Sequence, residues 1–298
     1  MLIMVLAVGL SAFGVGCSDG AEPSADVEGT EPLGIGREVT VPIAAAVATV
    51  ESPGDEPRGA LRAGFPDGTV QEVTLRTDHR IQQQINEQPP RDFSHPALTI
   101  PLTARTHDSD VDLTLGAVTT PDPALSQALT AADGSHAGLD MSELGAITAL
   151  RLAPSPDTSN SARAAIEQAF YQAVYQSITF PDDPVGVGAV WTVRQEVTGG
   201  VALEVTTATL TARDGNRLTI DLTVAQTPKS RTWNLPNDAG TLQIEDYAMT
   251  GAGTIIVDLG LPLPVSGAID IGGHQSYRDA RTDTLLRQTI STRVSWGE

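Results

Sequence analysis

Cysteine is almost absent from the chain, because its 298 residues contain one, Cys17. A single cysteine cannot form an intramolecular disulfide bond, and zinc sites usually draw on cysteines or histidines that lie in local pairs. The five histidines form no such pair and lie apart, at His79, His95, His107, His136 and His274. We therefore expect no disulfide framework, no metal site of this kind and no bound cofactor.

Basic and aromatic residues are also scarce. Lysine and arginine total 18 against 37 acidic residues, with Lys229 as the single lysine, so the formal net charge is −19. Nucleic-acid binding depends on basic side chains that displace counterions from phosphates, which excludes DNA and RNA as partners. Aromatic residues make up 4% of the chain and hydrophobic residues 40%. The core must therefore be mainly aliphatic.

Motifs that would indicate a metal site are incomplete. In HDSDVD, Asp108, Asp110 and Asp112 alternate along the chain. An EF-hand loop starting at Asp108 would need glycine at its sixth position and glutamate at its twelfth, where this chain has Leu113 and Thr119. On a strand, the three aspartates would share one solvated face, and a weak calcium site is the alternative.

Signals for catalysis are weak as well. No G-x-x-x-x-G-K phosphate loop occurs, and no G-x-G-x-x-G follows a predicted strand. In GGHQSYRD, His274, Tyr277 and Asp279 could form a polar cluster. Such trios on strands are usually surface or hairpin groups, so we do not expect an enzyme.

The N-terminal segment predicts export. Residues 2–16 carry no charge and are mostly apolar, which is too short for a bilayer-spanning helix and typical of a signal peptide over residues 1–16. Residues 17–35 are polar and rich in proline and glycine, which indicates a flexible tether. The residues around Cys17 resemble the bacterial lipobox, whose cysteine becomes lipid-modified. We expect Cys17 to attach the chain to a membrane of the cell envelope; a secreted protein with an incidental cysteine is the alternative.

From Gly36 onward the main pattern is period-two alternation of apolar and polar residues, broken by turn residues. This pattern predicts antiparallel strands. Asp214 and Gly215 should form the turn of a hairpin between two of them. About eleven strands are predicted, at residues 37–50, 69–77, 97–106, 110–120, 145–152, 189–197, 201–212, 217–227, 241–250, 253–260 and 285–296.

One segment follows a helical period instead. Over residues 159–178, apolar and small side chains recur at the i, i+3, i+4, i+7 spacing of one helix face, with Ser159 able to cap the start and Pro181 beyond the end. An isolated amphipathic helix must bury its apolar stripe against a sheet. We therefore predict an α+β fold, mostly antiparallel β, with a curved sheet or half-barrel and one long helix. Residues 36–158 and 181–298 would form its two β halves within one domain, joined by residues 159–180.

A turn and strand after this helix carry a family resemblance. PDDPVGVGAVW, residues 181–191, resembles the signature of a bacterial family of uncharacterised envelope lipoproteins, and the likeness extends over residues 58 to 298. The resemblance implies no catalytic residues. More remotely, a curved sheet with an apposed helix resembles the carriers that move lipids or lipoproteins across bacterial envelopes.

Two functions remain open from the sequence. The first is an anchored lipoprotein that binds or carries an apolar, lipid-like ligand between sheet and helix, at Ala169, Phe170, Val174 and Trp191. The second is a structural or protein-interaction lipoprotein of the envelope with no small ligand.

Overall fold

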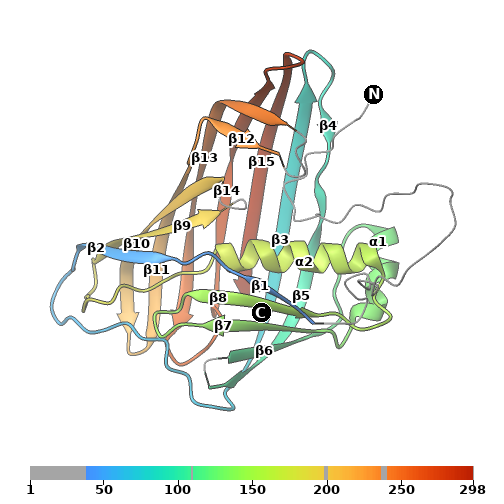
Figure 1. The fold of residues 1–298 in the computed structure, drawn as a ribbon. Coiled ribbons are helices and arrows are strands. Elements are labelled where there is room, and N and C mark those ends of the chain that lie inside the picture. Colours follow the sequence, from blue (N-terminus) through green and yellow to red (C-terminus); the bar gives the residue numbers. More distant parts are fainter. Residues whose placement is uncertain (1–37, 109, 198–200, 236–239, 298) are drawn as a thin grey trace, which may run out of the picture.

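The computed structural model describes residues 38–108, 110–197, 201–235 and 240–297. Cys17, the predicted signal peptide and the predicted tether lie outside these ranges. No helix within the described ranges is long and apolar enough to cross a bilayer. The fold is α+β and mostly antiparallel, as predicted: a single open sheet of fifteen strands carries one long helix, α2 (Asn160–Tyr175), across its face (Figure 1).

The strands follow one another along the chain with two short helical segments between them, α1 (Pro123–Leu129) and η1 (Thr130–Ala132). The strands are β1 (Val39–Pro42), β2 (Val47–Ser52), β3 (Val70–Ile85), β4 (Arg91–Asp92), β5 (His95–His107), β6 (Asp110–Leu115), β7 (His136–Met141), β8 (Ile147–Ala153), β9 (Val190–Val197), β10 (Ala202–Asp214), β11 (Arg217–Pro228), β12 (Thr232–Asn234), β13 (Thr241–Asp258), β14 (Ser266–Asp279) and β15 (Thr284–Gly297).

The two predicted β halves meet at the centre of the sheet, where β3 pairs with β15, and again at one edge, where β2 of the first half pairs with β9 of the second. The order across the sheet is β1-β8-β7-β6-β5-β3-β15-β14-β13-β11-β10-β9-β2, with β4 beside β3 and β12 beside β13. The strands β10 and β11 form the predicted hairpin, in which Asp214 pairs with Arg217.

The edges of the sheet are held near each other by a short connection. Strands β1 and β2 occupy opposite edges, yet Pro42 and Val47 are only five positions apart, which limits their separation to about 18 Å. Within the connection, the Ile43 amide donates to the Thr148 carbonyl of β8 (2.9 Å). The Gln195 side chain of β9 donates to the Ala44 carbonyl (2.7 Å). The sheet is therefore strongly curved into a half-barrel.

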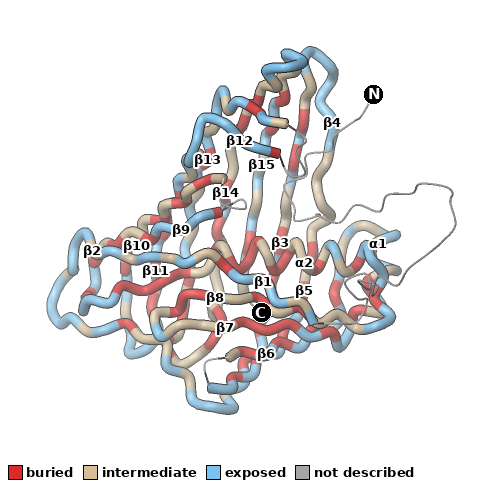
Figure 2. The backbone as a smooth tube through the Cα atoms, viewed as in Figure 1, coloured by how far each residue is buried: buried red, intermediate tan, exposed pale blue. Residues whose placement is uncertain are grey.

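Helix α2 lies inside this curve and begins where the sequence predicts. The Ser159 hydroxyl accepts from the Ala162 amide at the N-cap, and the helix ends at Tyr175 with Gln176 as its C-cap. Its apolar side packs into a cluster formed with the inner faces of β3 and β5–β8. A second apolar cluster fills the curve beneath β9–β11, β13 and β14. Figure 2 shows buried residues along α2 and at alternating positions of the strands.

Several elements differ from the predicted strands. The predicted strands 241–250 and 253–260 are one strand, β13. The predicted break falls at glycines that are part of the strand. A Cβ at Gly253 would lie 2.2 Å from the Ala268 carbonyl of β14, so only glycine permits the close approach of these two strands. Strands β7 and β14 were not predicted, since glycines interrupt their alternation. The predicted strand 37–50 divides into β1 and β2.

Candidate binding cavities beside helix α2

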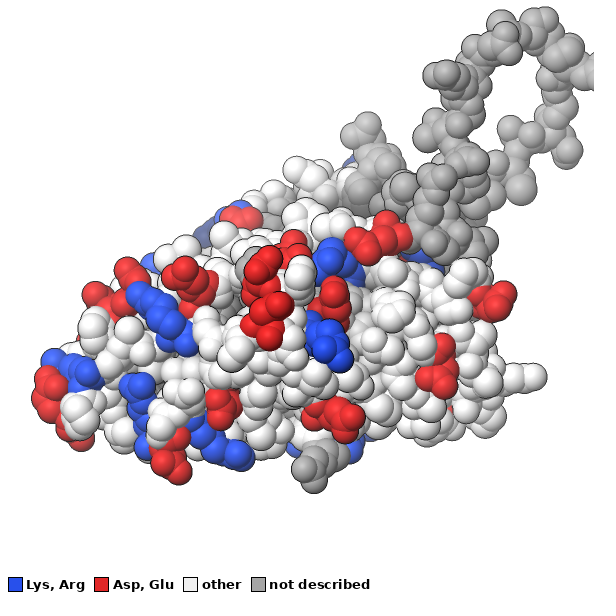
Figure 3. Space-filling model, turned by 90° about the horizontal axis from the view of Figure 1, so that it is seen from below, with Lys and Arg blue, Asp and Glu red and all other residues white. Residues whose placement is uncertain are grey.

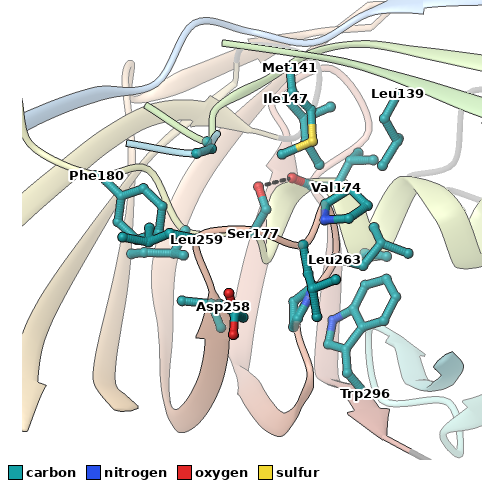
Figure 4. Close-up of a pocket in the computed structure, with 18 of the residues that line it drawn as sticks. Leu139, Met141, Ile147, Val174, Ser177, Phe180, Asp258, Leu259, Leu263 and Trp296 are labelled. Carbon is teal, nitrogen blue, oxygen red and sulfur yellow. Dashed lines mark hydrogen bonds between the residues drawn. The ribbon is translucent and has the colours of Figure 1, made fainter. Parts of the chain in front are cut away.

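An apolar cavity of about 60 Å³ lies beneath α2. Phe170, Val174 and Ser177 reach it from α2 and the turn that follows, while Leu139 and Ile147 reach it from β7 and β8 (Figure 4). On the far side it is bordered by Trp296 of β15 and by the loop after β13. The lining thus comes from both β halves and from the helix, at the point where the two apolar clusters meet.

The loop after β13, residues 259–265, closes one side of this cavity, and we call it the plug loop. Its sequence LGLPLPV alternates leucine with glycine and proline, which prevents it from continuing the strand. Leu259 and Leu263 are buried and lie against the cavity. Leu263 belongs to the cluster of α2, and Leu259 to the second cluster. The plug loop therefore seals the interior with apolar side chains.

One side chain fixes the plug loop to the sheet. The buried Gln71 of β3 accepts from the Leu263 amide and donates to the Leu263 carbonyl, both at 3.0 Å. An unpaired buried backbone group costs about 1–3 kcal/mol, so this double hydrogen bond matters for the loop's position.

The polar atoms at the cavity wall are already paired. The Ser177 hydroxyl donates to the Val174 carbonyl (2.9 Å). The Asp258 carboxylate accepts from the Gly260 amide (2.9 Å). Neither group needs a ligand to satisfy it, so a molecule in this cavity would make apolar contacts. At about 60 Å³, this cavity is smaller than an engineered apolar cavity of about 150 Å³ that accommodates benzene. A ligand of the size of benzene or larger would therefore require the plug loop to move.

The structure separates the four predicted ligand contacts. Phe170 and Val174 line the apolar cavity. Ala169 is buried in the same cluster without lining it. Trp191 is fully buried in the second cluster, where its indole N–H donates to the Thr179 carbonyl (3.0 Å), and it lines neither cavity described in this section. Its position is that of a core anchor.

A second cavity, of about 150 Å³, lies on the opposite side of α2. The helix contributes Gln168, Tyr171, Gln172, Tyr175 and Gln176 to it. Facing strands contribute further amides, one carboxyl and several aliphatic side chains, and we call this space the amide cavity. The sequence pattern assigned the polar side of α2 no partner. One sequence feature could have indicated the amide cavity. In several strands a polar residue, such as Glu204 or Gln226, stands at an inward position where the alternation calls for an apolar one.

The aspartates of HDSDVD face an arginine. Asp110 and Asp112 lie 3.8 and 3.6 Å from Nη2 of Arg151, and Asp140 lies 3.2 Å from its Nε. Asp108 sits in the turn before β6 with a positive φ of 51°. The guanidinium thus occupies the position that a cation would take. Among the described residues, no group of three or more histidine, cysteine, aspartate or glutamate side chains could hold a metal ion.

The residues of GGHQSYRD are not brought together. His274 is exposed and pairs with Asp246 at 2.8 Å. Tyr277 points to the opposite, buried face of β14, where its hydroxyl donates to Gln275 (2.5 Å). Two other histidines lie together, although they are sixteen positions apart in the sequence. The β3–β5 register pairs His79 with His95, and their rings stack with centroids 5.7 Å apart.

Charged side chains of both signs are interspersed on the face seen from below (Figure 3). Comparison of the chain with protein-family models, with curated proteins and with solved structures found no match. The resemblance of PDDPVGVGAVW to envelope lipoproteins therefore stays a prediction.

Proposed function

We propose that this chain is a lipid-anchored protein of the bacterial cell envelope that binds an apolar ligand in the cavity between α2 and the plug loop. The observation that carries the proposal is an apolar-lined space beneath α2, at the point where the two apolar clusters meet. Apolar pockets with satisfied polar rims are the usual form of sites for apolar small molecules. Anchoring at Cys17 would keep such a site within tether reach of a membrane.

The ligand would enter when the plug loop moves. Leu259 and Leu263 would exchange contact with the core for contact with the ligand, so the apolar area exposed to water would change little. The alternative role, a structural lipoprotein without a small ligand, predicts a filled interior. The two cavities beside α2 favour the binding role.

Titration with the uncharged fluorophore N-phenyl-1-naphthylamine tests the proposal. We expect saturable fluorescence enhancement with the full chain. Ala173 is buried on α2 and lines the apolar cavity, so Ala173→Leu should fill part of it and weaken binding about tenfold. The matched control is Ala164→Leu, at an exposed position of the same helix. Circular dichroism should verify that both variants fold.

Two results would overturn the proposal. One is the absence of saturable binding by the folded wild-type chain. The other is equal binding by Ala173→Leu and Ala164→Leu, which would place the probe outside the apolar cavity.

A further inference from the structure

The amide cavity lies where two polar surfaces face each other inside the fold. Gln168, Gln172 and Gln176 recur every four residues and so form one row along α2. The opposing wall comes from β3, β9–β11 and β13–β15. This wall differs from the rest of the concave face, because amides and a carboxyl replace aliphatic residues at inward positions.

The polar groups of the sheet are already joined to one another. Glu204 accepts from the Gln226 amide (2.8 Å) and from the Thr206 hydroxyl (3.4 Å). Gln226 in turn accepts from the Tyr247 hydroxyl (3.2 Å). Gln288 donates to Gln83 (3.0 Å). These bonds hold the sheet side of the cavity in a fixed arrangement.

On the helix side of the cavity, in contrast, two polar atoms have no hydrogen-bond partner. Gln172 and Gln176 are only 9% and 8% exposed. The Gln172 Nε2 donor and the Gln176 Oε1 acceptor are buried and have no hydrogen-bond partner. Buried polar atoms are normally paired, and both side chains line the cavity. The two atoms are shielded from the cavity as the side chains lie, so a small rotation of each side chain would present one free donor and one free acceptor to a molecule in it.

The cavity also has a definite charge character. None of the residues described as lining it is a lysine or arginine. Burial lowers the pKa of His79 to about 4, so this histidine is uncharged at neutral pH. Burial also raises the pKa of Glu204. An anionic group would therefore enter the cavity without a counter-charge, which is costly.

Aliphatic side chains complete the lining, namely Ile81, Val197, Met249, Ile271 and Ile290. A ligand that contacts both kinds of surface must be partly apolar. Its polar group must accept from one amide and donate to another, as a hydroxyl or carboxamide does.

We infer that the amide cavity is a second binding site, which takes the uncharged, hydroxyl- or amide-bearing group of an amphipathic molecule and pairs it with Gln172 and Gln176. This site lies on the opposite side of α2 from the apolar cavity and does not depend on ligand binding there.

Calorimetric titration with three octyl amphiphiles tests the inference: octyl β-glucoside, octyl sulfate and octyltrimethylammonium, each below its critical micelle concentration. The full chain should bind the glucoside saturably and the two charged probes at least about tenfold more weakly. The double variant Gln172→Leu, Gln176→Leu should lose about tenfold or more in affinity for the glucoside. The matched control is Gln127→Leu, at an exposed position of α1.

Because the double variant removes two unpaired buried groups, it should fold at least as stably as the wild type, which urea unfolding can verify. Ala173→Leu should leave glucoside binding unchanged, which separates this site from the apolar cavity. The inference is overturned if no probe binds saturably, since the cavity then holds water only. It is also overturned if a charged probe binds as tightly as the glucoside, or if the double variant binds the glucoside like Gln127→Leu.

Discussion

The side chain of Gln71 and the backbone of Leu263 exchange two hydrogen bonds of 3.0 Å across 192 positions of sequence. This pair joins the first strand of the central β3–β15 pairing to the plug loop. Because the side chain takes the place of a backbone partner, the loop is held without being part of a strand. Release of this pair is the simplest route by which the apolar cavity could open.

Gln71→Leu should loosen the plug loop. The substitution leaves the amide and carbonyl of Leu263 unpaired, so we expect the free energy of unfolding to fall by about 2 kcal/mol. Hydrogen exchange of residues 259–265 should accelerate more than that of β13 and β14. The control is Gln243→Leu, at an exposed position of β13. Unchanged exchange in the loop would show that Gln71 does not hold it.

The stability of the protein should depend on pH through His79. Burial, and secondarily the neighbouring His95, lower its pKa from 6.5 to about 4, with Asp78 acting in the opposite direction. Between these values the unfolded chain binds a proton that the folded chain does not. The free energy of unfolding should therefore fall as the pH is lowered from 6.5 towards 4, by up to about 3 kcal/mol.

Urea unfolding at several pH values measures this effect. His79→Gln should flatten most of the slope and leave a smaller part from His95, whose pKa burial also lowers. His136→Gln, at an exposed position of β7, should keep the wild-type slope. A His79→Gln variant with the full slope would contradict the assignment.

Through Glu204, the stability of the protein should depend on pH in the opposite direction. Burial raises its pKa, so above the ordinary value the unfolded chain gives up a proton more readily than the folded chain does. The free energy of unfolding then falls as the pH rises from about 4. Glu204→Gln should raise the urea midpoint at pH 7, and this advantage should shrink towards pH 4. Glu72→Gln, exposed on β3, is the control; an advantage that grows at low pH would contradict the sign.

The helix and the sheet class could be predicted because their signals are local. The i, i+3, i+4 series and the Ser159 cap fixed the start of α2. Alternation identified most strands, and Asp214–Gly215 identified the β10–β11 turn. Strand β14 was missed because Gly267 and Gly273 stand at inward positions, where they supply no side chain, and Gly272 interrupts the outward face.

The cavities could not be predicted because they depend on distant pairings. Gln172 and Gln176 lie opposite the apolar stripe of the predicted helix, and nothing local says that a sheet with Glu204 and Gln226 would cover them. The plug loop was equally hidden, because Leu259 and Leu263 become core residues through clusters of distant strands, and Leu263 is held by Gln71, far away in the chain. Phe170 and Val174 line the apolar cavity because they belong to the apolar stripe itself, and their contact with a ligand stays a prediction.

Lipid attachment at Cys17 predicts where the protein is found. Two acyl chains on Cys17 would give stable membrane binding. Cys17→Ala should move the protein from the membrane fraction to the soluble fraction of a bacterium that processes lipoproteins. Cys17→Ser serves as a second variant with nearly the same shape. Retention of either variant in the membrane fraction would contradict the anchor.

The proposed function requires an apolar ligand in the apolar cavity beneath α2. Its most direct test is organic extraction of the full chain, purified from the membrane in which it is made, followed by mass spectrometry of the extract. We expect a co-purifying apolar molecule at a fixed ratio to the protein, greatly reduced in Ala173→Leu and retained in Ala164→Leu. A folded wild-type protein that yields nothing beyond its own acyl chains would contradict it.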